Sequence, residues 1–128
     1  MAKNTKATKL NKEHVFLKDP ELHDYPAAQD YLELLMTPKE AQKIVAALKK
    51  APTIIKKAKD IFRASELPLL PKDNRHVQHN LDKFKDKEKL SPLLLVRGKD
   101  KLIIADGYHR MCASYYLTED LEIPCRLV

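Results

Sequence analysis

One stretch near the C-terminal end, Leu102 to Ala113, constrains the fold more than any other part of the chain. Its first residues, Leu102 to Ala105, are apolar and include adjacent isoleucines, which is typical of a buried strand. Gly107 then provides the backbone freedom for a sharp turn. Helix-forming residues follow as far as about Leu117. The stretch therefore predicts a strand that turns directly into a helix.

Charged side chains gather at this turn, with Asp106 at the strand end and His109 and Arg110 in the first helical turn. A helix N-terminus presents free N–H groups and a partial positive charge, so it attracts anions. A guanidinium matches phosphate oxygens, and a carboxylate is a hard ligand for Mg²⁺. The pattern indicates a phosphate or Mg-phosphate site. The alternative is that Asp106 only caps the helix, Arg110 forms a surface ion pair, and His109 is a satisfied polar residue.

The length of 128 residues predicts one domain with an appendage. No apolar run approaches the roughly 18 residues of a membrane-spanning helix, and the N-terminal lysines precede no apolar segment of a secretory signal. Cys112 and Cys125 do not have metal-site spacing, so we expect reduced structural thiols in a cytoplasmic protein. Cys112 is either a reactive thiol or, as we favour, a buried side chain that packs in the core.

The net charge of +6 is concentrated in residues 39–65, which hold 8 basic and 2 acidic residues. A local basic face indicates binding of DNA, RNA or another polyanion, or else a solvated helix face. The residues that would contact nucleic acid are Lys49, Lys50, Lys56, Lys57 and Lys59.

The first half of the chain has helical patterns. Residues 1–14 are expected to be a disordered basic tail. A helix is predicted from Asp24, which is expected to cap it, and Thr37-Pro38-Lys39-Glu40 forms a capping box that opens the next. Pro52 is expected to begin a further helix, so residues 15–64 are predicted to be a helical extension. The apolar stripe of that further helix would be Ile54, Ile55, Ala58, Ile61 and Phe62.

The second half, residues 65–128, predicts a small α+β unit. A polar loop is expected over residues 72–77, a short helix over 80–89, and a hairpin of strands 92–96 and 102–105. A last strand is expected at 123–128, with its proline at an edge or start position.

Several apolar residues of the first half have two interpretations. We expect them to cover the α+β core; the alternative is that they dock a partner or a second copy of the chain, which would make a homodimer. They are Tyr31, Leu34, Leu35, Ile54 and Ile61.

The order of motifs in residues 65–128 resembles that of the ParB/sulfiredoxin superfamily. The loop Asp73-Asn74-Arg75-His76-Val77 is similar to the first box of that family. Leu90-Ser91-Pro92-Leu93-Leu94-Leu95-Val96 is similar to its proline and apolar strand, and Gly107-Tyr108-His109-Arg110-Met111-Cys112-Ala113 to its Gly-x-x-Arg box. Glu122-Ile123-Pro124-Cys125-Arg126 resembles the closing strand.

The resemblance implies a site for a nucleoside triphosphate, ATP or CTP, with a divalent metal such as Mg²⁺. Family members use such a site for CTP switching, sulfinic acid repair, phosphorylation of free serine or, in some reports, nuclease activity. Tyr108 occupies the place of the catalytic Cys of sulfiredoxins, which argues against sulfinic acid repair. Partition proteins have Gly-Glu-Arg-Arg at this turn, which also differs. The closest similarity is to the Asp-Gly-x-His-Arg turn of the serine-kinase-like branch.

The resemblance also assigns residues. Asp106 and His109 would be catalytic, and Asp106 would hold the metal. The general base is open among Glu66, Asp73 and His76, and Tyr108 either stacks on a base or, as we favour, packs. The expected function is phosphoryl transfer or triphosphate hydrolysis; the alternative is a partition- or nuclease-like nucleic-acid accessory protein. The nucleotide would contact Gly107, Tyr108, His109, Arg110, Asn74 and Arg75.

Overall fold

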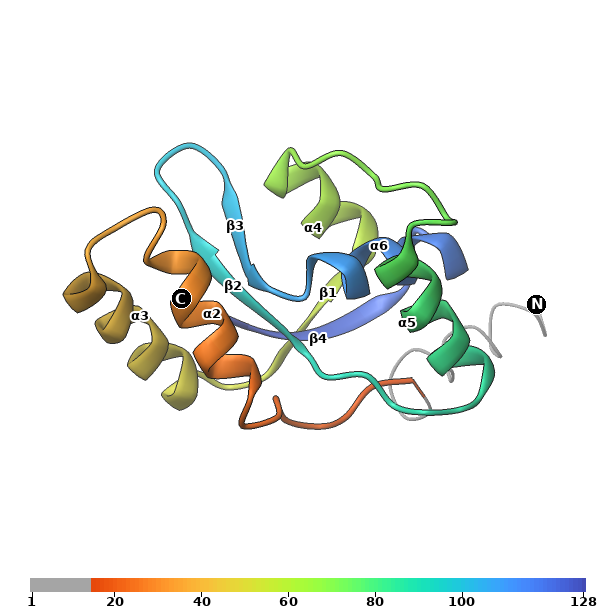
Figure 1. Cartoon of the computed structure of the whole chain (residues 1–128), viewed down its shortest axis with the longest axis horizontal. Coiled ribbons are helices and arrows are strands. Elements are labelled where there is room, and N and C mark those ends of the chain that lie inside the picture. The colour runs from red at the N-terminus through yellow and green to blue at the C-terminus, as the bar shows by residue number, and fades with distance from the viewer. Residues whose placement is uncertain (1–14) are drawn as a thin grey trace.

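The computed structural model describes residues 15–128, and these form a mixed four-stranded sheet with helices on both faces (Figure 1). The strands are β1 (Ile54–Lys57), β2 (Leu93–Arg97), β3 (Leu102–Asp106) and β4 (Glu122–Leu127), in the spatial order β1-β4-β2-β3. β2 is antiparallel to β3 and parallel to β4, and β1 is antiparallel to β4. The predicted α+β class is confirmed.

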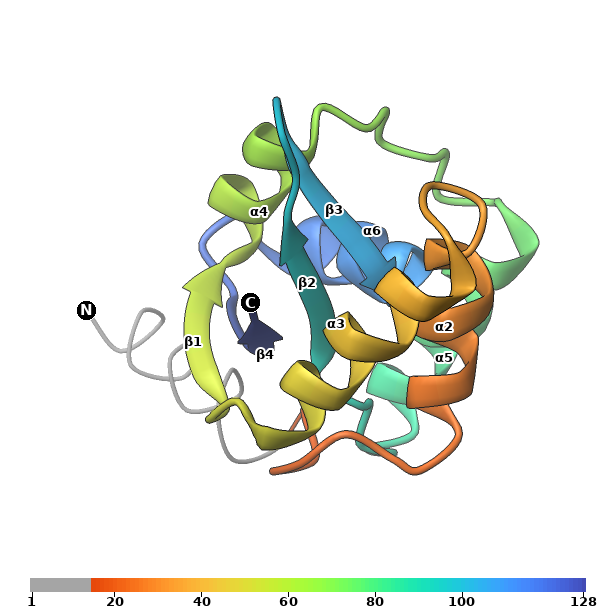
Figure 2. The same ribbon diagram turned by 90° about the vertical axis from the view of Figure 1, so that its left-hand side faces the viewer.

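Two groups of helices cover the sheet (Figure 2). On one face, α2 (Asp24–Leu32) and α3 (Pro38–Lys50) pack on Leu94, Val96 and Ala105. On the other, α4 (Ala58–Ser65), α5 (Arg75–Lys85) and α6 (Tyr108–Leu117) pack on the side chains that alternate with these. The core on that second face includes Leu93, Leu95, Ile104, Ile123 and Cys125.

Several predicted elements are confirmed. β2 and β3 form the expected hairpin, β3 leads through Gly107 into α6, and β4 is the expected last strand. The prediction that its proline takes an edge or start position is wrong, because β4 lies between β1 and β2 and Pro124, inside the strand, pairs with Ile55. The capping box also forms, because Thr37 Oγ1 accepts a hydrogen bond from Glu40 N at 3.2 Å and Thr37 N donates to Glu40 Oε1 at 3.1 Å. These hydrogen bonds satisfy amides that the first turn of α3 would otherwise leave free.

The helix predicted after Pro52 is wrong for residues 54–57, which form β1. Ile54 pairs with Cys125 and Ile55 with Pro124, and only at Ala58 does the chain enter α4. Adjacent β-branched isoleucines favour an extended backbone once a neighbouring strand is there to pair with. The segment 15–64 is therefore not entirely helical, and it contributes a strand to the sheet of the second half.

The polar loop predicted at residues 72–77 is shorter than expected, because α5 begins at Arg75 and ends at Lys85. Asn74 is its N-cap: the side-chain Oδ1 accepts hydrogen bonds from His76 N at 3.0 Å and Val77 N at 3.2 Å. Val77 is fully buried and anchors the first turn. A good cap and one buried apolar residue are sufficient to start the helix earlier than periodicity alone predicts.

The helix from Asp24 is confirmed, but its cap is not. Asp24 is the first helical residue and His23 precedes it, without a capping hydrogen bond from its side chain. The helix ends at Leu32, and the expectation that Tyr31, Leu34 and Leu35 cover the core is wrong: they are 42%, 81% and 52% exposed. Among the other residues with that expectation, Ile61 is buried and Ile54 packs against the core.

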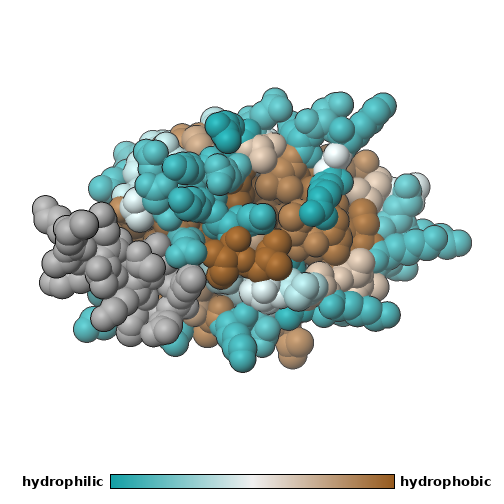
Figure 3. Space-filling view, turned by 180° about the vertical axis from the view of Figure 1, so that it is seen from behind, coloured by the Kyte–Doolittle hydropathy of each residue, from teal (hydrophilic) through white to brown (hydrophobic). Residues whose placement is uncertain are grey.

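Apolar side chains also reach the surface on the side of the molecule that faces away from the viewer in Figure 1. Figure 3 shows an apolar area there, bordered by hydrophilic side chains. A small groove of about 200 Å³ has Ile61, Leu95, Leu102 and Leu127 in its walls. Nothing in the described residues covers this groove.

Both cysteines are free and buried, as expected for structural thiols. Burial raises the pKa of the Cys112 thiol, and it raises the pKa of Cys125 to about 11, so neither is a ready nucleophile. The predicted tail, residues 1–14, lies outside the described residues. Within residues 15–128, no helix combines the length and the hydropathy needed to cross a membrane.

Candidate functional site

The turn between β3 and α6 can only be made by glycine. Gly107 has φ of 110° and ψ of 18°, a left-handed conformation that costs a side-chain-bearing residue strain. A Cβ at this position would clash with Leu93 Cδ2 and would lie 3.0 Å from Arg110 Nη2. The missing side chain therefore leaves the space that the Arg110 guanidinium occupies.

The N-terminus of α6 has no side-chain cap. The first hydrogen bond of the helix runs from Met111 N to Gly107 O at 2.8 Å, so the amides of Tyr108, His109 and Arg110 precede it and have no acceptor within the helix. Open N–H groups at a helix start attract an anion.

Arg110 is held at this turn by its guanidinium. Its Nη2 donates to Asp106 Oδ2 at 2.8 Å and to the Pro92 carbonyl at 3.2 Å. Its Nε is buried and has no hydrogen-bond partner among residues 15–128. A buried N–H without a partner is costly, so Arg110 Nε is a polar atom of this turn that the described residues leave unsatisfied.

Two histidines meet beside this turn. The His109 ring, in the first turn of α6, lies 4.8 Å from the His76 ring, in the first turn of α5, centroid to centroid. Burial lowers the pKa of His109, and the neighbouring His76 and Arg110 lower it further. Near neutral pH His109 is therefore a neutral imidazole that can donate one hydrogen bond and accept another.

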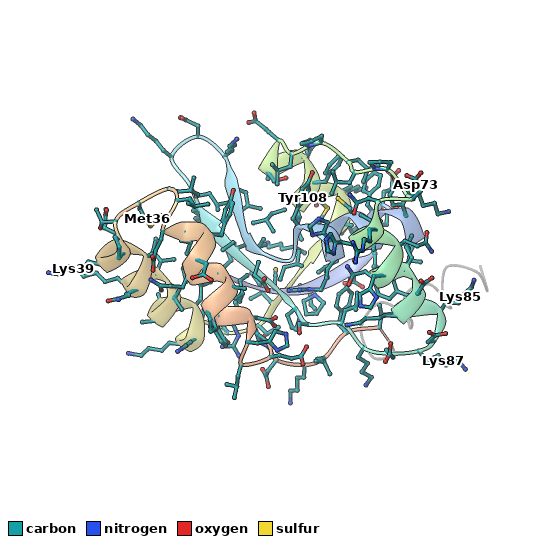
Figure 4. The ribbon with its side chains drawn as sticks, in the orientation of Figure 1. Met36, Lys39, Asp73, Lys85, Lys87 and Tyr108 are labelled. Carbon is teal, nitrogen blue, oxygen red and sulfur yellow. The ribbon has the colours of Figure 1, made fainter. Side chains whose placement is uncertain are left out.

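Tyr108 packs rather than projecting freely. Its hydroxyl donates to the Pro68 carbonyl at 2.5 Å, and the Tyr116 hydroxyl, also on α6, donates to the Leu70 carbonyl at 2.6 Å. These two hydrogen bonds tie the connection between α4 and α5 to α6. In Figure 4, Tyr108 lies where α6 begins, on the side of this connection. The packing interpretation of Tyr108 agrees with these contacts.

Asp106 is joined to Arg110 but not to His109: in the described part of the chain no hydrogen bond or ion pair links Asp106 with the imidazole. The predicted cluster of carboxylate, imidazole and guanidinium is thus two pairs, Asp106 with Arg110 and His109 with His76. Burial raises the pKa of Asp106; Arg110 opposes this, and a second carboxyl, Asp24, adds to it through its charge and a side-chain hydrogen bond.

Asp24 is the residue of this region that sequence reasoning missed. It comes from the start of α2 and is only 2% exposed. An acidic residue at a helix start is ordinarily read as a favourable contact with the helix dipole. No local signal in the sequence indicates its contact with Asp106.

The residues of the first box have other contacts. The Asn74 side chain is occupied as the cap of α5, and Arg75 is exposed at the first position of that helix. Arg75, His76 and Asp73 line a shallow depression of about 640 Å³. Of the three candidate general bases, His76 is the one in contact with His109; Glu66 ends α4 in a left-handed conformation, with φ of 56°.

Within residues 15–128 no group of three or more His, Cys, Asp or Glu side chains has the arrangement of a metal site. Mg²⁺ needs only one or two carboxylates when phosphates and waters supply its other ligands. Asp106 and Asp24 could provide those carboxylates, but Asp106 Oδ2 already accepts from Arg110. The metal at Asp106 stays a prediction.

The predicted basic helices do not form one face. Lys49 and Lys50 end α3, whereas Lys56 and Lys57 lie on β1, where successive side chains point in opposite directions. Lys59, on α4, forms an ion pair with Asp120 at 2.8 Å, which Lys57 approaches at 3.9 Å. The prediction of a basic face formed by two helices is wrong because β1 interrupts the helical pattern.

Comparisons of the chain with protein-family models, with curated proteins and with solved structures found no match. The resemblance to the ParB/sulfiredoxin superfamily therefore stays a prediction.

Proposed function

We propose that this protein binds the phosphates of a nucleoside triphosphate, ATP or CTP, at the N-terminus of α6 and uses them in phosphoryl transfer or hydrolysis. One arrangement supports this most: the uncapped first turn of α6 lies beside the His109–His76 pair and the spare Nε of Arg110. Backbone amides, imidazoles and a guanidinium are all donors to phosphate oxygens.

The proposed chemistry requires little covalent participation by the protein. Phosphoryl transfer depends on neutralising the charge of the phosphates and aligning the reacting groups. Arg110 and the α6 amides would neutralise charge, and His109, neutral near pH 7, would donate to a phosphate oxygen or move a proton with His76 as its partner. Magnesium would enter with the triphosphate and stabilise the charge on its oxygens.

Thermal unfolding with ATP, CTP, GTP and UTP, each with and without Mg²⁺, tests this proposal. A ligand that binds only the folded chain raises the melting temperature. We expect one or two triphosphates to do so, with loss of the effect in Arg110→Gln and a reduced effect in His109→Gln. Arg63→Gln is the matched control, because Arg63 is 87% exposed on α4. No shift with any triphosphate would contradict the proposal. If a triphosphate does raise the melting temperature, the release of inorganic phosphate separates hydrolysis from binding alone.

The second candidate function is binding of DNA or RNA, and it is favoured by one side of α3. Ala41, Val45 and Leu48 are the buried residues of this helix. Lys39, Lys43 and Lys50 lie on the opposite side, given about 3.6 residues per turn. Lys39 points away from the sheet in Figure 4. The three lysines form a row of about 16 Å, at about 1.5 Å per residue, that faces solvent.

The row of Lys39, Lys43 and Lys50 matches the spaced charges of a phosphate backbone, and none of the three forms an ion pair with a described acidic residue. Changing both Lys39 and Lys43 to Glu tests this function against a double change of Lys99 and Lys101 to Glu in the exposed β2–β3 turn. We expect only the first to weaken binding and to reduce the log–log salt slope by about two. Equal effects of both doubles would show that net charge, not α3, drives binding.

A further inference from the structure

The outer edge of β1 is open within the described part of the chain. β1 and β3 are the two edge strands of the sheet. The residues of β3 are buried or half-buried, and α2 and α4 both contact this strand. In β1, by contrast, Ile55, Lys56 and Lys57 are exposed. Figure 2 shows β1 at the margin of the sheet, with no labelled helix or strand beyond it.

The hydrogen bonds between β1 and β4 decide which backbone groups of β1 face outward. Ala58, one residue beyond the end of β1, donates from its N–H to Leu121 O at 2.9 Å. In an antiparallel pair, every second residue exchanges hydrogen bonds with the neighbouring strand. Lys56 therefore bonds to β4, whereas Ile55 and Lys57, on either side of it, turn their N–H groups away from β4. The carbonyl of Ile55 also points outward.

The backbone of β4 follows the same alternation. Val128, directly after β4, donates to Leu95 O at 3.2 Å and accepts from Arg97 N at 2.7 Å, so its backbone faces β2. Counted back by twos, Pro124 also faces β2, and its missing N–H removes no hydrogen bond from the β1 side. The outward N–H and C=O of Ile55, the residue paired with Pro124, are therefore free groups of a sheet edge and not gaps in the pairing with β4.

A groove lies beside this edge on each face of the sheet. Ile55 lines a groove of about 670 Å³ together with Phe16 and Pro124. Lys56 points to the opposite face and lines the groove of about 200 Å³ that also contains Leu127. The side chains of a strand added to β1 would alternate in the same way, so they would reach both grooves.

Lysines surround the open edge. Lys56 forms no ion pair with an acidic residue of the described part, and neither do Lys18 and Lys89, which line the larger groove. Lys57 lies 3.9 Å from Asp120, at the limit of an ion pair. Opposite charges on neighbouring strands attract, so this edge favours a strand that carries carboxylates.

The same lysines argue against other occupants. A second copy of the chain, paired edge to edge, would bring Lys56 and Lys57 of both copies to one seam, and lysines on edge strands commonly prevent such pairing. Residues 1–14 contain four lysines and one glutamate, so their charge does not match the edge either. A nucleic acid would match the lysines, but it would leave the outward N–H and C=O groups and the apolar grooves without suitable partners.

We propose that β1 is a docking edge for an extended acidic segment of another protein. The segment adds to the sheet as a further strand beside β1. It forms hydrogen bonds with the outward backbone groups of Ile55 and Lys57, and its carboxylates lie beside Lys56 and Lys57. The phosphate-binding turn follows β3, at the opposite edge of the sheet, so the docking edge does not depend on that site.

The first part of the test is amide hydrogen exchange of the full chain without a partner. The N–H of Lys56, which bonds to β4, should exchange slowly, and the N–H groups of Ile55 and Lys57 should exchange fast. Slow exchange at Ile55 in the free chain would mean that residues 1–14 or a second copy already pair with the edge, and it would overturn the proposal.

The second part is an NMR titration with the end-capped peptide Ser-Glu-Glu-Val-Val-Glu-Ser. Antiparallel to β1, this peptide places its valines opposite Ile54 and Ile55 and two glutamates opposite Lys56 and Lys57. We expect amide shifts centred on β1 and slower exchange at Ile55, and no effect of the matched peptide Ser-Lys-Lys-Val-Val-Lys-Ser. No binding of the acidic peptide, equal binding of both peptides, or shifts centred elsewhere would overturn the proposal. Displacement of the peptide from β1 by oligothymidylate would assign the edge to nucleic acid and would also overturn it.

Variants of the edge separate the backbone contacts from the charges. Ile55→Pro removes an outward N–H without removing a hydrogen bond to β4, and proline is tolerated at such edge positions. It should abolish peptide binding, whereas Ile55→Val should retain it. The double change Lys56→Glu and Lys57→Glu should lower the affinity for the acidic peptide about tenfold and create binding of the lysine peptide. If Ile55→Pro does not fold, the double variant decides: a retained preference for the acidic peptide would overturn the proposal.

Discussion

The rings of His76 and His109 lie 4.8 Å apart, although one belongs to the first turn of α5 and the other to the first turn of α6. This contact joins the two boxes of the sequence at one place. It also lowers the pKa of His109, after burial, which has the largest effect. The pKa of His109 therefore depends on the contact between the first turns of α5 and α6.

The pH dependence of stability should show the His109 effect. Because the pKa of His109 in the folded chain is lowered from 6.5, the unfolded chain binds more protons just below pH 6.5. The free energy of unfolding should therefore fall as the pH falls through this window. Urea unfolding between about pH 7.5 and about pH 5 should show a smaller loss in His109→Gln. His79→Gln, exposed on α5, is the control, and equal losses in both variants would contradict the assignment.

Asn74 caps α5 and is also predicted to contact the nucleotide, and two substitutions test these roles separately. Asn74→Ala removes the cap of α5 and should cost about 1 kcal/mol of unfolding free energy. Asn74→Asp keeps a capping oxygen, so we expect near wild-type stability, but its negative charge should weaken triphosphate binding if α5 begins beside the phosphates. Denaturant unfolding and ligand-dependent melting measure the two effects. Unchanged binding in Asn74→Asp would assign Asn74 to capping alone.

Gly107→Ala should destabilise the chain by about 1–3 kcal/mol, because it adds the strain of a positive φ and a steric clash with Leu93 Cδ2. Denaturant unfolding measures this loss. Asp100→Ala, in the exposed turn between β2 and β3, is the control and should be near neutral. A Gly107→Ala chain as stable as the wild type would mean that the turn has a different backbone conformation.

Tyr108→Phe should cost about 0.5–1.5 kcal/mol, because the hydroxyl loses its hydrogen bond to the Pro68 carbonyl. Hydrogen exchange should show faster opening of residues 67–71, the segment that Tyr108 and Tyr116 hold. Tyr116→Phe provides a matched second anchor on the same helix. If neither change affects exchange in this segment, the two hydroxyls do not hold it in solution.

The sequence predicts those parts of the fold in which the signal is local. The turn at Gly107 and the capping box at Thr37 each depend on a few neighbouring residues, and both are confirmed. The spacing of Ile54, Ile55, Ala58 and Ile61 fits a helix as well as a strand followed by a helix. Pairing with β4, far along the chain, decides between them.

The candidate site also combines local features, which the sequence predicts, with long-range contacts, which it does not. Asp106, His109 and Arg110 are adjacent in sequence, so their shared turn could be predicted. Their partners could not. The contact of Asp106 with Asp24 depends on the register shift at Ala105, and the contact of His109 with His76 depends on how α5 packs on α6. Neither depends on a pattern within a single segment.

The most direct test of the phosphate site is an NMR titration of the histidine ring nitrogens with tripolyphosphate at fixed pH. The site predicts that His76 and His109 shift together and saturate with one apparent affinity, whereas His23 and His79, in the same spectra, change little. Ring nitrogens report hydrogen bonds and protonation directly, so a phosphate at the α6 N-terminus cannot bind without perturbing them. Saturating shifts confined to His23 or His79, or none at all, would contradict the account.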